Sequence, residues 1–157
     1  MTPKPTGVEI TVSNRQRRWR VNTRLLARLA ERVLELVHDN RSRLSIVLVD
    51  DAAIAKLNAQ YHDTPGPTDI LSFDYGDEEG ELIISVEQAM THARRYRSTP
   101  DRELVLYLVH GILHLHGHDD RTPPDRRRMR AAERQLMVSL TRDPGFHGLI
   151  PRRITGR

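Results

Sequence analysis

The segment 110–120, HGILHLHGHDD, carries four of the chain's eight histidines together with two aspartates. His110 and His114 are four residues apart, and on a helix this spacing places both side chains on one face, with Cβ atoms roughly 5–6 Å apart. Two imidazoles at that distance can bind one Zn²⁺ ion, whose bonds to histidine nitrogen are about 2.0–2.1 Å long. The spacing therefore predicts a metal site.

The third ligand is expected just beyond the helix. Gly117 can adopt the left-handed conformation that ends a helix and turns the chain, and Asp120 follows three residues later. A carboxylate oxygen is an acceptable zinc ligand at about 2.0–2.2 Å. Asp120 has the right spacing, and His118 and Asp119 are the nearest alternatives. Three protein ligands leave a fourth position open, which is the arrangement of catalytic zinc sites.

The helix that carries the two histidines is apolar nearly all round. Residues 104–115 read LVLYLVHGILHL, a pattern typical of a helix buried in the middle of a domain. The alternative is that the histidines are surface or capping residues that bind no metal. Burying an imidazole costs free energy unless another group pairs with it. The apolar surroundings therefore favour metal binding.

The residue after the first histidine bears on the type of reaction. In the zinc peptidase pattern H-E-x-x-H, a glutamate at this position acts as the general base. Gly111 stands there instead and has no side chain that could take a proton. Peptidase activity of that type is therefore disfavoured. We expect the glycine to let another backbone or a substrate approach the helix closely.

The rest of the chain predicts a small sheet with helices. Strands are expected at 7–12, 43–50, 69–73 and 81–85, and helices at 22–40, 51–61, 86–97, 101–116 and 122–140. Candidate helix caps are Asn22 or Thr23, Asp50 or Asp51, and Thr122. We therefore expect one α/β (α+β) domain over residues 1–142, with a mixed four-stranded sheet and about five helices. The metal site is expected on a buried central helix and the turn after it.

Length and composition exclude several classes of protein. At 157 residues the chain is long enough for one domain with a hydrophobic core. It has no run of about 18 apolar residues that would span a membrane, and its N-terminal segment lacks the apolar core of a secretory signal. Without cysteine it can form neither a disulfide nor a thiolate metal site. We expect a cytoplasmic protein that does not bind membranes.

Charge is unevenly distributed, although the net charge is only +4. Residues 121–157 contain ten arginines and three acidic residues, whereas acidic residues gather at 74–81, DYGDEEGE. Arginine binds phosphate well, so such segregation favours a polyanionic partner; the alternative is an ordinary solvated surface. Trp19, in the basic segment 13–20, is expected at the edge of the core rather than stacked on a base. Residues 143–157 are expected to form a mobile basic tail.

Three motifs give the chain a likeness to a known family. Residues 110–120 match H-G-x-L-H-L-x-G-[YH]-D-H at ten of eleven positions, residues 57–73 (LNAQYHDTPGPTDILSF) are close to L-N-x-x-Y-R-x-x-x-x-P-T-D-V-L-S-F, and residues 80–85 (GELIIS) are close to G-D-I-x-I-S. On these motifs the chain resembles the YbeY family of bacterial rRNA maturation endoribonucleases, from about residue 8 to residue 140. The resemblance implies a single-domain zinc protein.

Two departures from the family pattern fall on functional positions. Asp120 stands where the family has its third zinc histidine, and His62 stands where it has an arginine thought to contact RNA phosphate. Asp120 adds negative charge, which is expected to make a bound zinc ion a weaker Lewis acid and to shift preference toward harder metals such as Mn²⁺. His62 can still donate a hydrogen bond to phosphate, but a histidine, unlike arginine, is only partly charged near neutral pH.

The resemblance also implies an activity and a set of roles. The activity is that of a metal-dependent, single-strand-specific endoribonuclease acting in rRNA maturation, at the 3′ end of 16S rRNA, and in ribosome quality control. Its partners would be single-stranded rRNA and the small ribosomal subunit, and its cofactor one Zn²⁺ per chain or another divalent ion. The metal ligands would be His110, His114 and Asp120; proton transfer would fall to His62, His118 or His116; His62, Arg126, Arg127 and Arg130 would bind the RNA backbone; and Asp69 and Ser72 would brace the site.

Four alternatives to these assignments are open, two for single residues and two for the whole protein. His116 and His118 fit equally well as exposed turn residues, and Asp69, a candidate acceptor for a ligand imidazole, could instead cap a strand. The whole protein could be a catalytically weak ribosome- or RNA-binding factor with a structural metal, which the residues at positions 62 and 120 would fit. A zinc hydrolase or peptidase agrees with the histidine spacing, but Gly111 argues against it.

Overall fold

Four strands form a single mixed sheet in the order β1-β2-β4-β3 in the computed structural model, which describes residues 7–143 and 146–151. The strands are β1 (Glu9–Asn14), β2 (Arg43–Val49), β3 (Ile70–Gly76) and β4 (Glu79–Ser85). β1, β2 and β4 are parallel, and β3 pairs antiparallel with β4 through a tight hairpin. The predicted mixed four-stranded sheet is confirmed.

Each helix begins at a side chain that caps its first turn. The helices are α1 (Thr23–Leu36), α2 (Asp51–His62), α3 (Val86–Arg95), α4 (Pro100–Leu115) and α5 (Pro123–Thr141), and their caps are Asn22, Asp50, Ser85, Thr99 and Thr122. Each cap oxygen accepts a hydrogen bond from a backbone N–H of the first turn, which has no partner within the helix. The prediction of about five helices is confirmed for the described part of the chain.

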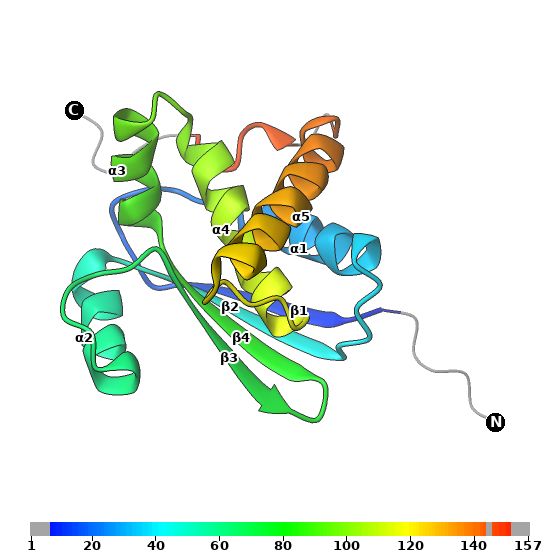
Figure 1. Ribbon diagram of the computed structural model, residues 1–157. Coiled ribbons are helices and arrows are strands. Elements are labelled where there is room, and N and C mark those ends of the chain that lie inside the picture. Colours follow the sequence, from blue (N-terminus) through cyan, green and yellow to red (C-terminus); the bar gives the residue numbers. More distant parts are fainter. Residues whose placement is uncertain (1–6, 144–145, 152–157) are drawn as a thin grey trace.

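The two faces of the sheet are covered unequally. Successive strand residues point to opposite faces, so Ile46 and Leu82 join a large core beneath α1, α4 and α5, while Val47 and Ile83 join a small cluster beneath α2. Figure 1 shows α4 and α5 on one side of the sheet and α2 on the other. As predicted from its apolar sequence, α4 is buried along most of its length.

Gly111 is the point at which α4 lies against the sheet. A side-chain carbon there would overlap Ile70 Cδ1 of β3 and lie 2.8 Å from Leu82 Cδ2 of β4. The sequence predicted close approach by another backbone or by a substrate. Instead, the side chains of the sheet occupy the space that the glycine leaves.

Residues beyond α5 pack on the domain. Phe146 and Leu149 are buried in the main core, and the backbone N–H groups of Gly148, Leu149 and Ile150 donate to Asp101 at the start of α4. The mobile tail predicted for 143–157 is therefore incorrect for 146–150, because two apolar side chains anchor this segment. The rest of that prediction, at 144–145 and 152–157, lies outside the described residues.

Trp19 lies in the core, as its expected position at the core edge suggested. Trp19 is 4% exposed within the main core, and the Arg18 guanidinium lies 4.5 Å from its ring centre. Within residues 7–143 and 146–151, no helix combines the length and apolar character needed to cross a bilayer.

Substituting Gly111→Ala tests the close contact of α4 with the sheet. Leu82 is fully buried, so an added methyl group cannot be accommodated without strain. We expect the free energy of unfolding to fall by about 1–3 kcal/mol in denaturant titrations. Ser139→Ala, at an exposed position of α5, is the control. If Gly111→Ala instead stabilises the protein by about 1 kcal/mol, as helix propensity alone would give, α4 leaves room for a methyl group against Ile70 and Leu82.

Candidate metal centre

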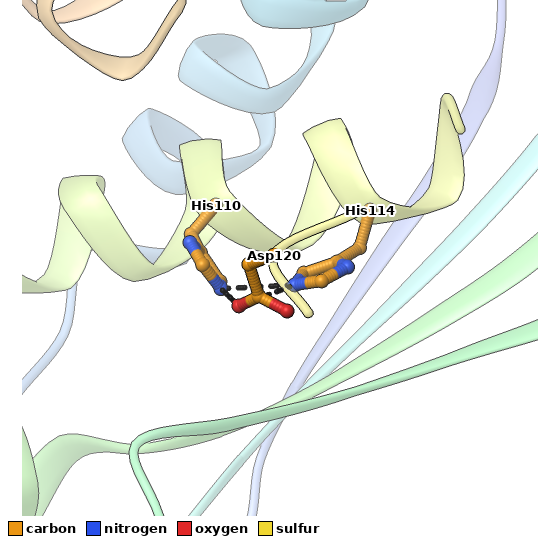
Figure 2. Close-up of side chains that lie close together, drawn as sticks. All are labelled: His110, His114 and Asp120. Atoms are coloured by element: carbon orange, nitrogen blue, oxygen red, sulfur yellow. Dashed lines mark hydrogen bonds and ion pairs between the residues drawn. The ribbon is translucent and has the colours of Figure 1, made fainter. Parts of the chain in front are cut away.

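His110 and His114 lie side by side on α4, one helical turn apart. Their Nε2 atoms are 3.0 Å apart, and both side chains are somewhat less than one-third exposed. Figure 2 shows the two rings directed at a common point beside α4, where the carboxylate of Asp120 also lies. The predicted pairing of these residues is thus present in the structure.

Asp120 reaches the same point from the turn after α4. Gly117 takes a positive φ of 106° and turns the chain, as its position predicted. Asp120 Oδ2 then lies 3.4 Å from His114 Nε2 and 3.6 Å from His110 Nε2. Arg126, in the first turn of α5, donates to the carbonyl oxygens of Asp120 and Arg121 and so fixes this turn.

The three ligand atoms have the spacing that one metal ion requires. Ligands at about 2.0–2.1 Å around a tetrahedral ion lie roughly 3.4 Å from one another, close to the observed separations. His110, His114 and Asp120 form the group that could hold an ion among the described residues, and neither His118 nor Asp119 belongs to it. Asp120 is 41% exposed, so one side of the cluster faces solvent. The arrangement suits a divalent ion with an open coordination position.

Glu133 of α5 positions the first histidine. Its Oε1 atom lies 2.8 Å from His110 Nδ1, and its side chain is 15% exposed. A carboxylate that accepts a hydrogen bond from the N–H of one ring nitrogen leaves the other nitrogen of the histidine free to bind metal. This contact fixes the orientation of the His110 ring and the nitrogen that faces the cluster.

The electrostatic surroundings of His110 are strongly acidic. Burial disfavours the charged imidazole and lowers its pKa, but the hydrogen bond and charge of Glu133, together with the charges of Asp69 and Asp120, outweigh this effect. The pKa of His110 in the metal-free protein is therefore raised above its ordinary value. The same carboxylates that stabilise a proton at this position favour a bound cation.

Asp69 was one candidate acceptor for a ligand imidazole, with a strand cap as its alternative role. Asp69 lines the cleft, but its carboxylate accepts a hydrogen bond from Thr68 Oγ1 at 3.4 Å. The hydrogen-bond partner of His110 Nδ1 is Glu133 instead. A signal for Glu133 exists in the sequence, because this acidic residue interrupts an apolar stripe of α5. The stripe consists of Met129, Leu136, Met137 and Leu140, all of which are buried.

Ser72 contributes a weaker contact between β3 and α4. Its hydroxyl lies 3.5 Å from the carbonyl oxygen of Gly111, the limit of a hydrogen bond. This contact does not reach a metal ligand, and the bracing role of Ser72 stays a prediction.

The cluster of His110, His114 and Asp120 forms one wall of a cleft of about 650 Å³. His62 lines this cleft from the end of α2, and Arg121 lines it from the turn beyond α4. Polar side chains provide much of the remaining lining, from Asn58, Thr64, Thr68, Asp69, Ser72, Asp74 and Asp119. The cleft therefore brings His62 together with the three predicted metal ligands.

His116 and His118 lie outside this cleft. His116 Nδ1 is 2.7 Å from Asp39, a nearly buried carboxylate that also pairs with Arg41 at 3.6 Å. His118 lines a different hollow, beside His116 and Arg128. The expectation that either histidine transfers protons at the metal centre is thus not supported by their placement, because α4 ends before His116 and the chain turns away.

The arginines predicted to bind RNA lie on the exposed surface of α5. Arg126, Arg127 and Arg130 are exposed, and none of them lines the cleft. Arg126 donates instead to the backbone carbonyl oxygens of Asp120 and Arg121. Arg121, which was noted only as one of ten clustered arginines, is the arginine that reaches the cleft wall.

The fold and this cluster define a small mixed-sheet protein with a candidate site for one divalent ion. The sequence model described as endoribonuclease YbeY matches residues 11–141. The chain belongs to the endoribonuclease YbeY family.

Relatives named endoribonuclease YbeY are identical to this chain at more than a third of the aligned positions. Identity is 37% over 147 residues with the protein of Myxococcus xanthus, 38% over 132 with that of Symbiobacterium thermophilum, and 37% over 150 with that of Pelotomaculum thermopropionicum. These alignments cover 87%, 74% and 85% of this chain. The chain spans half of the Myxococcus protein, but 85% and 99% of the other two.

A solved structure has the same fold. The solution structure of TM1509 from Thermotoga maritima gives a TM-score of 0.58 and covers 88% of this chain and 96% of that one. Identity between the two is 23%, so this likeness concerns the fold alone.

Glu133→Gln tests the support of His110 from α5. Glutamine has nearly the same shape but lacks the charge, so we expect metal affinity to fall about 10–100-fold, the usual effect of removing such a partner. Competition with a chromophoric chelator measures the affinity. Glu31→Gln, at an exposed position of α1, is the matched control. Equal affinity in Glu133→Gln and the parent chain would show that Glu133 plays no part in the centre.

Proposed function

We propose that the protein is a metal-dependent, single-strand-specific endoribonuclease. Its proposed roles are the maturation of rRNA, at the 3′ end of 16S rRNA, and ribosome quality control. The observation that carries the proposal is the His110–His114–Asp120 cluster, open on one side within a polar cleft, in a chain of the endoribonuclease YbeY family. Single-stranded rRNA and the small ribosomal subunit are the proposed partners, and the cytoplasm the proposed location.

The metal centre would activate the phosphate for attack. His110, His114 and Asp120 would hold one Zn²⁺, and the carboxylate also suits a harder ion such as Mn²⁺. A divalent ion there supplies Lewis acidity toward a phosphoryl oxygen. Glu133 and Arg126 hold the ligands in place from α5, the first through His110 and the second through the backbone of Asp120. Such fixed placement limits the rearrangement that substrate binding requires.

His62 is the proposed residue for proton transfer and phosphate binding in the cleft. It is the histidine outside the metal cluster that lines the cleft, and it is exposed. Histidine can donate to a phosphate oxygen and can take or give a proton near neutral pH. His116 and His118, the other candidates, lie outside the cleft, so the proposal assigns them no direct part in the reaction.

The basic surface would hold the RNA backbone. Arg121 lies at the cleft wall, while Arg126, Arg127 and Arg130 extend along exposed α5 beyond it. Contacts of this kind with phosphates release counterions, so the affinity is expected to fall as salt is raised.

A catalytically weak RNA-binding factor remains the second candidate. The observation that favours it is the pair of departures from the family pattern, His62 and Asp120. A peptidase has less support, because Gly111 faces Ile70 and Leu82 of the sheet and offers no general base beside His110.

His114→Ala tests the role of the metal centre. Removing one of three ligands should reduce bound metal from about one ion per chain to near zero, and cleavage of single-stranded RNA should fall to background. Elemental analysis and a gel assay measure the two effects. His147→Ala, at an exposed histidine far along the chain, controls for loss of a histidine as such. RNA cleavage by well-purified, metal-free His114→Ala protein would contradict the proposal.

The double substitution His62→Arg with Asp120→His separates the two candidates. We expect the parent chain to cleave single-stranded RNA and to leave casein intact, and the double variant to cleave RNA at least as fast, since it gains a permanent charge and a stronger Lewis acid. A parent chain that is inactive with added metals, and becomes active only with both substitutions, would favour the RNA-binding factor. Casein cleavage would favour the peptidase.

A further inference from the structure

Three of the chain's seven aromatic residues gather at one place on its surface. Tyr61 lies in the last turn of α2, and Phe73 and Tyr75 lie two residues apart on β3; we call these three residues the aromatic patch. Tyr61 and Tyr75 are 57% and 62% exposed, and Phe73 is partly buried. Large exposed rings that contact one another are unusual on a soluble surface and mark a binding function more often than isolated ones do.

The rings of the patch are held in defined orientations. Phe73 and Tyr75 are nearly parallel, at 10° with centroids 6.4 Å apart, and Tyr61 meets Phe73 edge-on at 5.3 Å. The Tyr75 hydroxyl donates to Glu81 at 2.6 Å, which fixes that ring. Side chains that are already ordered lose little conformational freedom when a ligand binds them.

The patch continues directly from the metal cleft. His62 lines the cleft and stacks on Phe73, with centroids 6.3 Å apart and planes 30° apart. Ser72 and Asp74 line the cleft, while Phe73, the residue between them, points to the other face of the strand. Because β3 is an edge strand of the sheet, a chain leaving the cleft can pass over this edge and reach the patch.

We propose that the aromatic patch stacks unpaired bases of single-stranded RNA, one or two nucleotides from the phosphate held at the metal centre. This inference rests on the proposed function and deepens it, because it gives the preference for single strands a structural origin. Bases paired in a duplex already stack on one another and present no free face to a ring. Stacking on aromatic side chains tolerates every base, so the patch selects for strandedness rather than sequence.

Charge decides which part of the RNA meets the patch. Glu81 lies beside Tyr75, and the hairpin between β3 and β4 carries Asp77 and Glu78. These carboxylates repel phosphate, so the backbone must stay on the side of His62 while the bases turn toward the rings. The acidic hairpin therefore also limits the patch to one or two bases.

The size of the patch argues against a protein partner. An aromatic side chain buries about 150–250 Å² when fully covered, and these three rings are already partly covered by their neighbours. The patch therefore offers well below the roughly 800 Å² per partner that a stable protein interface buries. One or two bases fit an area of this size.

Binding of labelled oligoribonucleotides tests the proposal. The probes are a single-stranded oligomer and the same oligomer with abasic sites flanking its centre, and fluorescence anisotropy with the metal-loaded protein gives the affinities, with probe integrity checked on a gel. We expect Tyr61→Ala and Tyr75→Ala each to bind the complete oligomer about tenfold more weakly and to lose most of the preference for it over the abasic one. Tyr61→Phe, which keeps the ring, should bind like the parent chain. Tyr75→Phe keeps the ring but loses the hydrogen bond to Glu81, so its affinity should lie between those of the parent chain and Tyr75→Ala.

Tyr96→Ala is the control, because Tyr96 is 63% exposed but lies outside the patch and the cleft lining. Metal content should be the same in all variants. Parent-level affinity in both alanine variants, or equal binding of the complete and abasic oligomers by the parent chain, overturns the proposal and leaves the patch to a protein partner. Failure of the proposed function would be seen differently: the parent chain would cleave no RNA with any added metal.

Discussion

The contact of α4 with the sheet at Gly111 determines where the metal centre can form. Because this residue has no side chain, α4 lies directly on Ile70 and Leu82. The neighbouring residues His110 and His114 are then held at the edge of the sheet, above the polar end of β3, where Ser72 and Asp74 complete the cleft wall. A bulkier residue at 111 would move the helix and both imidazoles away from that wall.

The cluster depends on contributions from three separate parts of the chain. α4 supplies two imidazoles, the turn after it supplies Asp120, and α5 supplies Glu133 to orient His110. Three carboxylates, those of Asp69, Asp120 and Glu133, act on the same imidazole. Such a concentration of negative charge is expensive to keep together without a counter-charge, and a bound cation would relieve it.

Local sequence patterns predicted most of the fold. Apolar periodicity located all four strands and five helices of the described chain, and the caps at Asn22, Asp50 and Thr122 were among the candidates. The spacing of the histidines and the turn at Gly117 predicted the cluster, including Asp120. These features depend on residues close together in the sequence, which is why they could be predicted.

Long-range contacts could not be predicted in the same way. Glu133 lies 23 positions from His110, and helical spacing alone does not say which face of α5 meets α4. The direction of His116 depends on Asp39, which is 77 positions away, and the placement of Phe146 and Leu149 depends on room in a core formed by other elements. His62 and Phe73 likewise meet only because α2 ends beside the edge strand.

X-ray absorption spectroscopy of the metal-loaded protein tests most directly whether two imidazoles and one carboxylate bind a single ion. The account predicts scattering from two imidazole rings at about 2.0–2.1 Å together with oxygen ligands at about 2.0–2.2 Å, and loss of one oxygen ligand in Asp120→Ala. A spectrum without imidazole scattering, or one with three imidazoles and no change in Asp120→Ala, would contradict it.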